Sequence, residues 1–389
     1  MNELIVRIAA RGDGVTSAGR HVPFGVPGDA LLDDGALAYG PHHQEPPCSH
    51  FPECGGCQLQ HADDEAYREY LVSRVETALL QHGLETEIRS PHLSPLNSRR
   101  RATLKALKAG QGAVIGFSAA QSHRVIDMLE CHILRPELFA LVDPLRRLLA
   151  DMLQPKRIAE VQLTLIDGGP DVLLKGLHAR RLDEIEQLTS FATSHDLARL
   201  GIDRGLGPET LFEPQRATVT MSGVPVVFAP GGFLQATEEG EDALVRSVQE
   251  ALAGEKDIAD LFAGLGTFAL ATGAHYAAEA SRDAAAALKR AAPTMTVEHR
   301  DLYRRPLDGG ELKRFDGVVL DPPRAGAVEQ VSRLAGSRVS RIAYVSCNPA
   351  TFARDARTLV DGGYRLGWVE PVGQFRWSTH VELAACFSR

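Results

Sequence analysis

Asp260-Leu261-Phe262-Ala263-Gly264-Leu265-Gly266-Thr267-Phe268 is the stretch that decides the fold. It overlaps an apolar run at 258–262, which predicts a buried strand, and it opens a segment with helical periodicity. Glycines at such a junction let the backbone turn tightly and approach a ligand closely. Glu279 lies 19 residues after Asp260, near the expected end of the next strand, where an acid commonly binds ribose hydroxyls.

The pattern after residue 236 predicts a doubly wound, Rossmann-like α/β domain. Short apolar strands at 258–262, 317–320 and 342–345 alternate with helical stretches, and ligands bind at the carboxyl ends of such strands. Asp301 is expected to end a further strand and to meet an adenine amine. The order acid-x-x-x-Gly-x-Gly lacks a third glycine and is more typical of S-adenosylmethionine binding than of NAD binding. Phe262, Gly264, Glu279 and Asp301 are therefore candidate cofactor residues.

Three reactive side chains follow or enter predicted strands of this domain. Asp321 precedes two prolines, which fix the backbone and aim the carboxylate into the crevice. Cys347 ends a strand at a ligand-binding edge, where a stabilised thiolate acts as a nucleophile. Glu382 lies in an apolar segment, where a charge is costly unless it faces a site, and a carboxylate there can be a general base. The alternatives are a loop-capping Asp and an inert buried Cys.

The 389 residues exceed one ordinary domain. We expect a short β-rich unit at 1–45, a mixed α+β central region at 46–235 and the α/β domain at 236–389. A helix at 63–84 is expected to pack on the α/β domain, and strands at 161–166 and 172–177 to form a hairpin.

Composition and charge exclude several classes of protein. Glycine and proline are spread without a repeat, and no apolar run is long enough for a membrane helix. The start of the chain has no signal-peptide pattern, so we expect a cytoplasmic monomer without membrane contact. The net charge of −8 does not indicate nucleic-acid binding on its own.

Three cysteines are clustered near residue 50, and a fourth lies downstream. The spacing Cys48-x5-Cys54-x2-Cys57, with Cys131, supplies four thiolates. Structural disulfides are rare in a chain of this kind. On spacing alone, a zinc site and an iron–sulfur cluster both remain open.

These pieces together resemble the RNA uracil-5-methyltransferase family over about 48–389. The resemblance rests on Ser346-Cys347-Asn348-Pro349-Ala350-Thr351 with Ala353-Arg354-Asp355, on Asp321-Pro322-Pro323-Arg324, on Phe233-Leu234-Gln235 and on His380-Val381-Glu382. It implies that Cys347 is the nucleophile and Glu382 the base. It also implies that Asp321 and Gln235 line the target base and the methyl donor. Gly264, Glu279 and Asp301 would hold S-adenosylmethionine, and Phe233 would stack on the extruded base.

The resemblance extends to the cysteines and to RNA binding. Iron–sulfur members of the family are similar to this chain around Cys54-Gly55-Gly56-Cys57 and Cys131, which favours a [4Fe–4S] cluster over zinc. Arg99-Arg100-Arg101 forms the best local basic patch, and a similar run lies near RNA in the family; the alternative is a solvated strand edge.

The target RNA follows from the same comparison. The opening unit resembles the small RNA-binding TRAM barrel of the large-subunit rRNA enzymes, but the strands after Gly28-Asp29 are expected to be mostly missing. The tRNA enzyme of the family lacks the cysteines, so 23S rRNA is the expected target, with tRNA as the alternative. Two other readings are an amino-group methyltransferase on the same fold and a catalytically silent iron–sulfur RNA-binding module.

Overall fold

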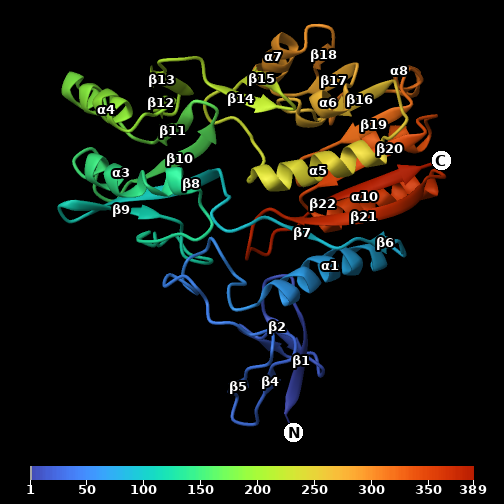
Figure 1. Ribbon diagram of the computed structural model, residues 1–389, viewed down its shortest axis with the longest axis horizontal. Coiled ribbons are helices and arrows are strands. Elements are labelled where there is room, and N and C mark those ends of the chain that lie inside the picture. The colour runs from blue at the N-terminus through green and yellow to red at the C-terminus, as the bar shows by residue number, and fades with distance from the viewer. Residues whose placement is uncertain (1) are drawn as a thin grey trace.

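The computed structural model describes residues 2–389 and arranges them as three units (Figure 1). A small N-terminal sheet lies at the bottom of the view, a central unit at the upper left, and the C-terminal unit on the right. Within residues 2–389, no helix combines the length and the apolar composition that a membrane crossing requires.

The C-terminal unit is built on one mixed sheet of nine strands. In spatial order its strands are β18 (Thr296–His299), β17 (Tyr276–Glu279), β16 (Ile258–Leu261), β19 (Gly317–Leu320), β20 (Arg341–Ser346), β22 (Glu382–Ser388), β21 (Arg365–Gly373) and β6 (Glu87–Ile88), with β7 (His92–Leu93) also on β21. The first five are parallel, and the chain runs outward from β16 in both directions. The gap between β16 and β19 is therefore the topological switch point, where such sheets bind ligands. The expected α/β class is confirmed.

Helices cover both faces of this sheet, because successive residues of each strand point to opposite sides. Val318 packs on the face of α1, α9 and α10, whereas Val319 packs on the face of α5, α6 and α7. The helices of the unit are α1 (Asp64–Leu80), α5 (Glu238–Ala251), α6 (Thr267–Thr272), α7 (Arg282–Ala291), α8 (Gly309–Leu312), α9 (Val328–Ala335) and α10 (Pro349–Asp361). Each apolar side chain buried in these layers stabilises the fold by about 1.5–3 kcal/mol.

Two early segments complete the C-terminal sheet, so this unit is not confined to residues 236–389. The expected helix is α1, capped by Asp63, whose side chain accepts the Ala66 N–H at 2.9 Å. It packs against α10 and β21. Strands β6 and β7 follow it and pair in parallel with β21 at the sheet edge, a contribution that the short segment 87–93 did not reveal.

The central unit is a sheet of six strands with helices on it. Its elements are β8 (Arg101–Ala109), β9 (Gly112–Gly116), α2 (Pro136–Phe139), α3 (Val142–Leu149), β10 (Ile158–Ile166), β11 (Gly169–Lys175), α4 (Leu182–Ser194), β12 (Arg199–Asp203) and β13 (Pro208–Phe212). The hairpin β10–β11 is antiparallel, as expected. A two-stranded ribbon, β14 (Thr218–Met221) and β15 (Val224–Val227), leads to the C-terminal unit.

The N-terminal unit has more strands than the sequence suggested. Its strands are β1 (Glu3–Ile8), β2 (Gly14–Thr16), β3 (His21–Val22), β4 (Ala30–Leu31) and β5 (Leu37–Ala38). Two of them follow Asp29, so the expectation that these strands are mostly missing is wrong. They are only two residues long, which hides them from pattern analysis. The buried Asp29 fixes the turn, because its carboxylate accepts from Val26 and Gly40 N–H groups and contacts His43.

Candidate active site

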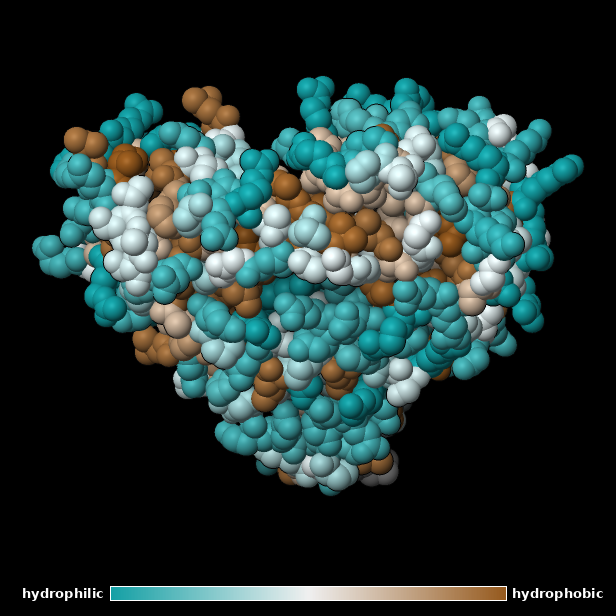
Figure 2. Space-filling model, turned by 45° about the horizontal axis from the view of Figure 1, so that its top comes forward, coloured by the Kyte–Doolittle hydropathy of each residue, from teal (hydrophilic) through white to brown (hydrophobic). Residues whose placement is uncertain are grey.

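One large cavity, of about 780 Å³, lies between the central unit and the carboxyl ends of the C-terminal strands. Figure 2 shows the molecule hollowed between its two upper lobes, with hydrophobic residues gathered there. Every residue proposed for catalysis, cofactor binding or base binding lines this cavity: Phe233, Gln235, Phe262, Gly264, Glu279, Asp301, Asp321, Cys347 and Glu382.

The turn between β16 and α6 requires glycine at two points. Gly264 has φ of +57° and Gly266 has φ of +95°, both in the left-handed region. A Cβ on Gly266 would lie 2.4 Å from a side-chain carbon of Leu288 in α7, so this glycine also allows close helix packing. The Gly264 N–H donates to Glu279 at 2.8 Å, which ties the turn to the acid at the end of β17.

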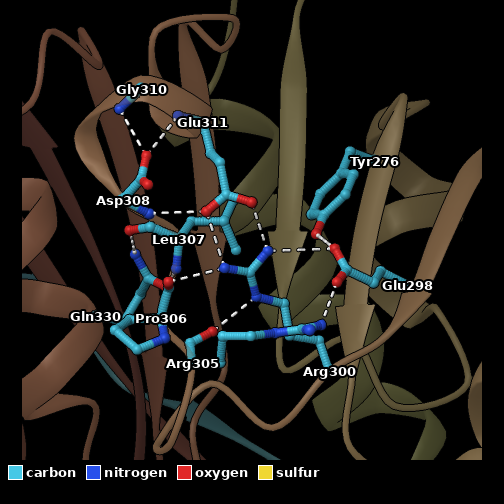
Figure 3. A network of polar contacts seen from close by, with 10 residues as sticks. All are labelled: Tyr276, Glu298, Arg300, Arg305, Pro306, Leu307, Asp308, Gly310, Glu311 and Gln330. Atoms are coloured by element: carbon cyan, nitrogen blue, oxygen red, sulfur yellow. Dashed lines mark hydrogen bonds and ion pairs between the residues drawn. The ribbon is translucent and has the colours of Figure 1, made fainter.

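A buried arginine holds the loop that follows β18 (Figure 3). Arg300 donates to the carbonyls of Arg305 at 2.7 Å and Pro306 at 2.8 Å. It also pairs with both oxygens of Glu311, at 2.6 and 2.8 Å, and with Glu298 at 3.3 Å. These carboxylates, Glu311 first, raise the pKa of Arg300. A bidentate pair of this kind fixes geometry as well as charge.

The loop that Arg300 holds forms one wall of the cavity. The Asp301 carboxylate accepts the Tyr303 N–H at 3.0 Å, and the Tyr303 hydroxyl donates to the Gly326 carbonyl at 2.9 Å. The Tyr303 ring lies 5.6 Å from that of Phe262, centroid to centroid. Phe262 has φ of +67°, a conformation that is costly for a bulky residue and persists only where the surroundings impose it.

Three strand ends bring Asp321, Cys347 and Glu382 together. Asp321 follows β19, Cys347 follows β20, and Glu382 begins β22. Ser346, the last residue of β20, pairs with Leu383 of β22. Because the two strands are antiparallel, Cys347, which follows Ser346, and Glu382, which precedes Leu383, lie at the same end of the pair. Regular sheet geometry therefore places a thiol beside a carboxyl group.

The turn after Cys347 is fixed by its polar neighbours. Asn348 caps α10 by accepting the Ala350 N–H at 3.2 Å, and its amide donates to the Arg324 carbonyl at 3.0 Å. The Thr351 hydroxyl donates to the same carbonyl at 3.1 Å. These bonds join the Cys347 turn to the loop that carries Asp321.

Burial and like charges keep protons on this site. The pKa of Asp321 is raised to about 7 by burial and then by Glu279. Burial and Asp321 raise the pKa of Glu382 to about 8. Burial, Glu382 and Asp321 raise the pKa of Cys347 to about 11. Each group becomes easier to ionise when a cation enters the cavity, because opposite charge favours the ionised form.

Another part of the cavity wall combines Arg101 of β8 with the segment between β15 and α5 and with Gln374, which follows β21. Phe233 is 60% exposed, and the Arg101 guanidinium lies 4.6 Å from its ring centroid. The Gln235 side-chain carbonyl accepts from Gln374 at 2.9 Å, and the Gln374 carbonyl in turn accepts the Ala236 N–H at 3.0 Å. An open aromatic ring next to a fixed amide pair is suited to stack on and orient a planar polar ligand.

The three consecutive arginines, predicted as a basic patch for RNA, differ in their surroundings. Arg100 is buried, and it pairs with Glu241 at 2.7 Å. Arg99 and Arg101 are partly buried and line the cavity. The Arg99 guanidinium lies 5.3 Å from the Phe375 ring centroid. The alternative of a solvated strand edge does not hold for Arg100, whose side chain is turned into the interior. RNA binding by the three arginines stays a prediction, and the cavity-lining Arg99 and Arg101 are placed best for it.

The four clustered cysteines gather around a second, smaller cavity, which Cys48, Cys54, Cys57 and Cys131 line. Burial raises the pKa of all four thiols, that of Cys57 to about 12. Within residues 2–389, no group of three or more His, Cys, Asp or Glu side chains is placed so that it could hold a metal ion. The chain thus brings the thiols to one place without arranging them as a coordination shell.

Several cavity residues escaped sequence reasoning. Gln374 and Phe375 lie in the loop between β21 and β22, and Tyr303 lies in the loop after β18. His380, which precedes Glu382 in the motif His380-Val381-Glu382 but was given no role, also lines the cavity. The polar and aromatic run that starts at Gln374 interrupts two apolar strands, and that break in the pattern was the available signal.

Comparisons with known proteins agree with this geometry. The family model described as tRNA (uracil-5-)-methyltransferase matches residues 291–389. An RNA methyltransferase of Zymomonas mobilis is 49% identical over 99% of both chains. The 23S rRNA (uracil(1939)-C(5))-methyltransferase RlmD of Photorhabdus laumondii is 31% identical over 91% of this chain and 84% of its own. The chain belongs to the RNA (uracil-5-)-methyltransferase family. It is thus an S-adenosylmethionine-dependent RNA methyltransferase, and the expected family and enzyme class are confirmed.

A solved structure shares the whole architecture of this methyltransferase. The Pyrococcus abyssi tRNA (uracil-54, C5)-methyltransferase, in complex with S-adenosyl-L-homocysteine, superimposes with a TM-score of 0.75. It is 23% identical, and each chain is covered over its full length. This likeness concerns the fold alone.

Proposed function

We propose that this enzyme forms 5-methyluridine in 23S rRNA through a covalent adduct between Cys347 and C6 of the target uracil, with Glu382 as the base. The observation that carries the proposal is the register of β20 and β22, which sets Cys347 and Glu382 side by side at the rim of one cavity. Asp321 lies in the same cavity.

The chemistry follows from the weak nucleophilicity of uracil C5. The Cys347 thiolate adds to C6, and the C5–C6 electron pair becomes part of an enolate. Bound S-adenosylmethionine would supply an electrophilic methyl group: C5 bonds to this carbon as the S–CH3 bond breaks, and neutral S-adenosylhomocysteine is left. Glu382 then takes the C5 proton, the C5–C6 double bond reforms, and the thiolate leaves. Each group acts in its deprotonated form, so the raised pKa values make Cys347 and Glu382 dependent on a neighbouring positive charge.

The residues around the glycine turn fit an S-adenosyl group. Gly264, Phe262 and Glu279 would hold the ribose, and Asp301 the adenine. Asp321, Glu279 and Glu382 give the cavity an acidic rim, which matches a sulfonium cation. Gln235 would bridge donor and base, while Phe233 would stack on the extruded uracil.

The 23S rRNA target is supported by the name of the Photorhabdus laumondii relative and by its coverage of most of this chain. The five-stranded N-terminal unit supports RNA binding outside the cavity. A tRNA uridine is the second candidate, because the Pyrococcus abyssi structure with the same architecture acts on tRNA. We expect the enzyme to work as a monomer.

The four cysteines share one cavity but are not arranged as a coordination shell within residues 2–389, so their side chains would have to turn toward a [4Fe–4S] cluster, or toward zinc as the alternative, to hold it. Their convergence on one buried cavity fits a group that binds thiolates, since four desolvated thiols gain little from being together. His50 and His132 line that cavity with the cysteines, whereas His61 packs against the rings of Phe24 and Phe51 and lies outside it. A cluster here would support folding or RNA docking.

Methyl-labelled S-adenosylmethionine and RNA from a strain lacking the gene test the proposal. The label is expected as 5-methyluridine in 23S rRNA. Label in tRNA would move the proposal to its second candidate, and any other labelled nucleoside would overturn the adduct mechanism. Iron and sulfide analysis of anaerobically purified enzyme tests the cluster, and zinc without sulfide would contradict it.

A further inference from the structure

The loop at 374–381, which joins β21 to β22, carries part of the cavity wall and ends at Glu382. It has no partner strand of its own. Trp377 lies in it with φ of +58°, a left-handed conformation that costs a non-glycine residue of this size free energy. Such a loop keeps its conformation only if surrounding groups hold it.

The segment that contains the cysteines supplies those groups. The Gln58 and Leu59 N–H groups both donate to the Trp377 carbonyl, at 2.8 and 2.9 Å. The Thr379 N–H donates to the Gln58 side-chain oxygen at 3.3 Å. The Gln58 amide nitrogen donates to the Gly55 carbonyl at 2.7 Å, which orients the side chain. One residue therefore links the loop to the backbone between two cysteines.

Side-chain packing makes the same connection. The Trp377 ring is 3% exposed and packs with Cys57 and Ile133. Gly56 and Phe117 line both the large cavity and the cysteine cavity, so they form the wall between the two. A Cβ on Gly56 would lie 3.1 Å from the Phe117 ring, which shows how closely this wall is packed.

Helix α1 gives the loop a second support that does not depend on the cysteines. The Tyr67 hydroxyl lies 3.0 Å from the Phe375 carbonyl and 3.2 Å from the Ser378 carbonyl. The Tyr70 hydroxyl donates to the Thr379 carbonyl at 3.2 Å. These contacts come from α1 and do not involve the cysteine segment, so the loop has two separate supports.

We propose that Gln58 and Trp377 are positioning residues, through which the packing of the cysteine segment sets the loop 374–381 and with it Glu382. The catalytic consequence rests on the proposed function of Glu382; the mechanical link does not. The cysteine site would then act on methyl transfer without taking part in it: loosening the segment would free the loop and misplace the base.

The test compares Gln58→Ala with Gln44→Ala in the full-length enzyme purified anaerobically. Gln44 donates to the Gln60 carbonyl at 2.8 Å, so the control removes a hydrogen bond to the same segment without touching the loop. The first measurement is the hydrogen exchange of peptides covering residues 375–381. The second is the fluorescence emission of Trp377, measured in a Trp368→Phe background because the chain has two tryptophans. Gln58→Ala is expected to speed exchange of the loop about tenfold and to shift emission to longer wavelength. Gln44→Ala should change neither.

Turnover and cofactor binding separate positioning from general damage. Gln58→Ala should slow methyl transfer about tenfold at saturating RNA. The Kd for S-adenosylmethionine should stay within about twofold, because the glycine turn lies on other strands. Gln58→Glu keeps an oxygen for the Thr379 N–H and should restore slow exchange. The proposal is overturned if loop exchange is unchanged in Gln58→Ala, or if cofactor binding falls in parallel with methyl transfer. Hydrogen exchange is measured without the methyl-transfer reaction. The link between the cysteine segment and the loop is therefore tested even if the adduct mechanism proves wrong.

Discussion

The strand ends around Cys347 and the segment around Cys57 both present a cysteine to an internal cavity, but they are built differently. Cys347 takes its place from paired strands, with β20 and β22 in fixed register. Cys57 lies in irregular chain, and its neighbours come from residues near 117, 131 and 377. Regular structure positions a group through local hydrogen bonding, whereas an irregular segment depends on distant partners. We therefore expect the Cys347 site to lose activity when one reactive group is removed. The segment around Cys57 should instead lose its ordered conformation when a distant contact is removed.

The largest effect should come from replacing the proposed nucleophile. Cys347→Ala is expected to lower methyl transfer by at least about 10³-fold, because no other thiol reaches the uracil. S-adenosylmethionine should still bind, as measured by calorimetry. Cys386→Ala is the matched control: Cys386 is a buried cysteine of the same sheet, opposite Ala343 and outside the cavity. Equal losses in both variants would contradict a chemical role for Cys347.

Glu382→Gln should separate the two halves of the reaction. Methyl transfer to the adduct is expected to proceed, while release of the product slows about 10²–10⁴-fold, because no base takes the C5 proton. The measurement is the amount of RNA bound covalently to protein on a denaturing gel. Glu370→Gln is the control, since Glu370 lies on β21 and accepts from Ser247 at 3.0 Å. Rapid turnover of Glu382→Gln would remove this residue from its role.

The pH dependence should follow the raised pKa values at the strand ends. Glu382, with a pKa of about 8, is protonated at pH 6 and ionised at pH 9. Glu382 and Cys347 both act in their ionised forms, and the pKa of Cys347 is raised to about 11, so turnover should rise throughout the range from pH 6 to 9. A maximum at pH 6 would contradict the assignment. Glu370→Gln should keep the wild-type profile.

Arg300→Lys should give the smallest effect of the series. It extends the comparison to the loop after β18, which Arg300 holds through its ion pair with Glu311. Lys cannot reproduce the fork that binds Glu311 and two carbonyls. We expect KM for S-adenosylmethionine to rise about fivefold, with kcat nearly unchanged, because Asp301 loses its fixed position. Arg305→Lys alters an exposed pair with Glu298 and should have little effect. An unchanged KM for S-adenosylmethionine in Arg300→Lys would show that the loop after β18 keeps its conformation without these Arg300 contacts.

What could be predicted from the sequence follows the same division. The glycine turn, the acid of β17 and the strand ends at Asp321 and Cys347 are local patterns with fixed periods, so they could be placed on the fold before it was known. The sequence did not reveal that Arg100 turns inward onto Glu241, because its partner lies 141 residues away. Gln374 was missed for the same reason: its place is set by Gln235.

The edge strand β6 is synthesised long before its partner strand, so the C-terminal sheet cannot be completed until the end of the chain is made. Its partner β21 begins at Arg365, 277 residues after the end of β6 at Ile88, and Ile88 pairs with Val369. The first pieces of the C-terminal sheet therefore leave the ribosome well before the strand that pairs with them. Contacts of such sequence separation close slowly. A nascent chain would carry the apolar side of α1 uncovered until α10 is synthesised, and exposed apolar surface of this kind favours aggregation. A recombinant fragment starting at residue 236 would lack β6 and β7, so the edge of β21 would be unpaired and open to self-association.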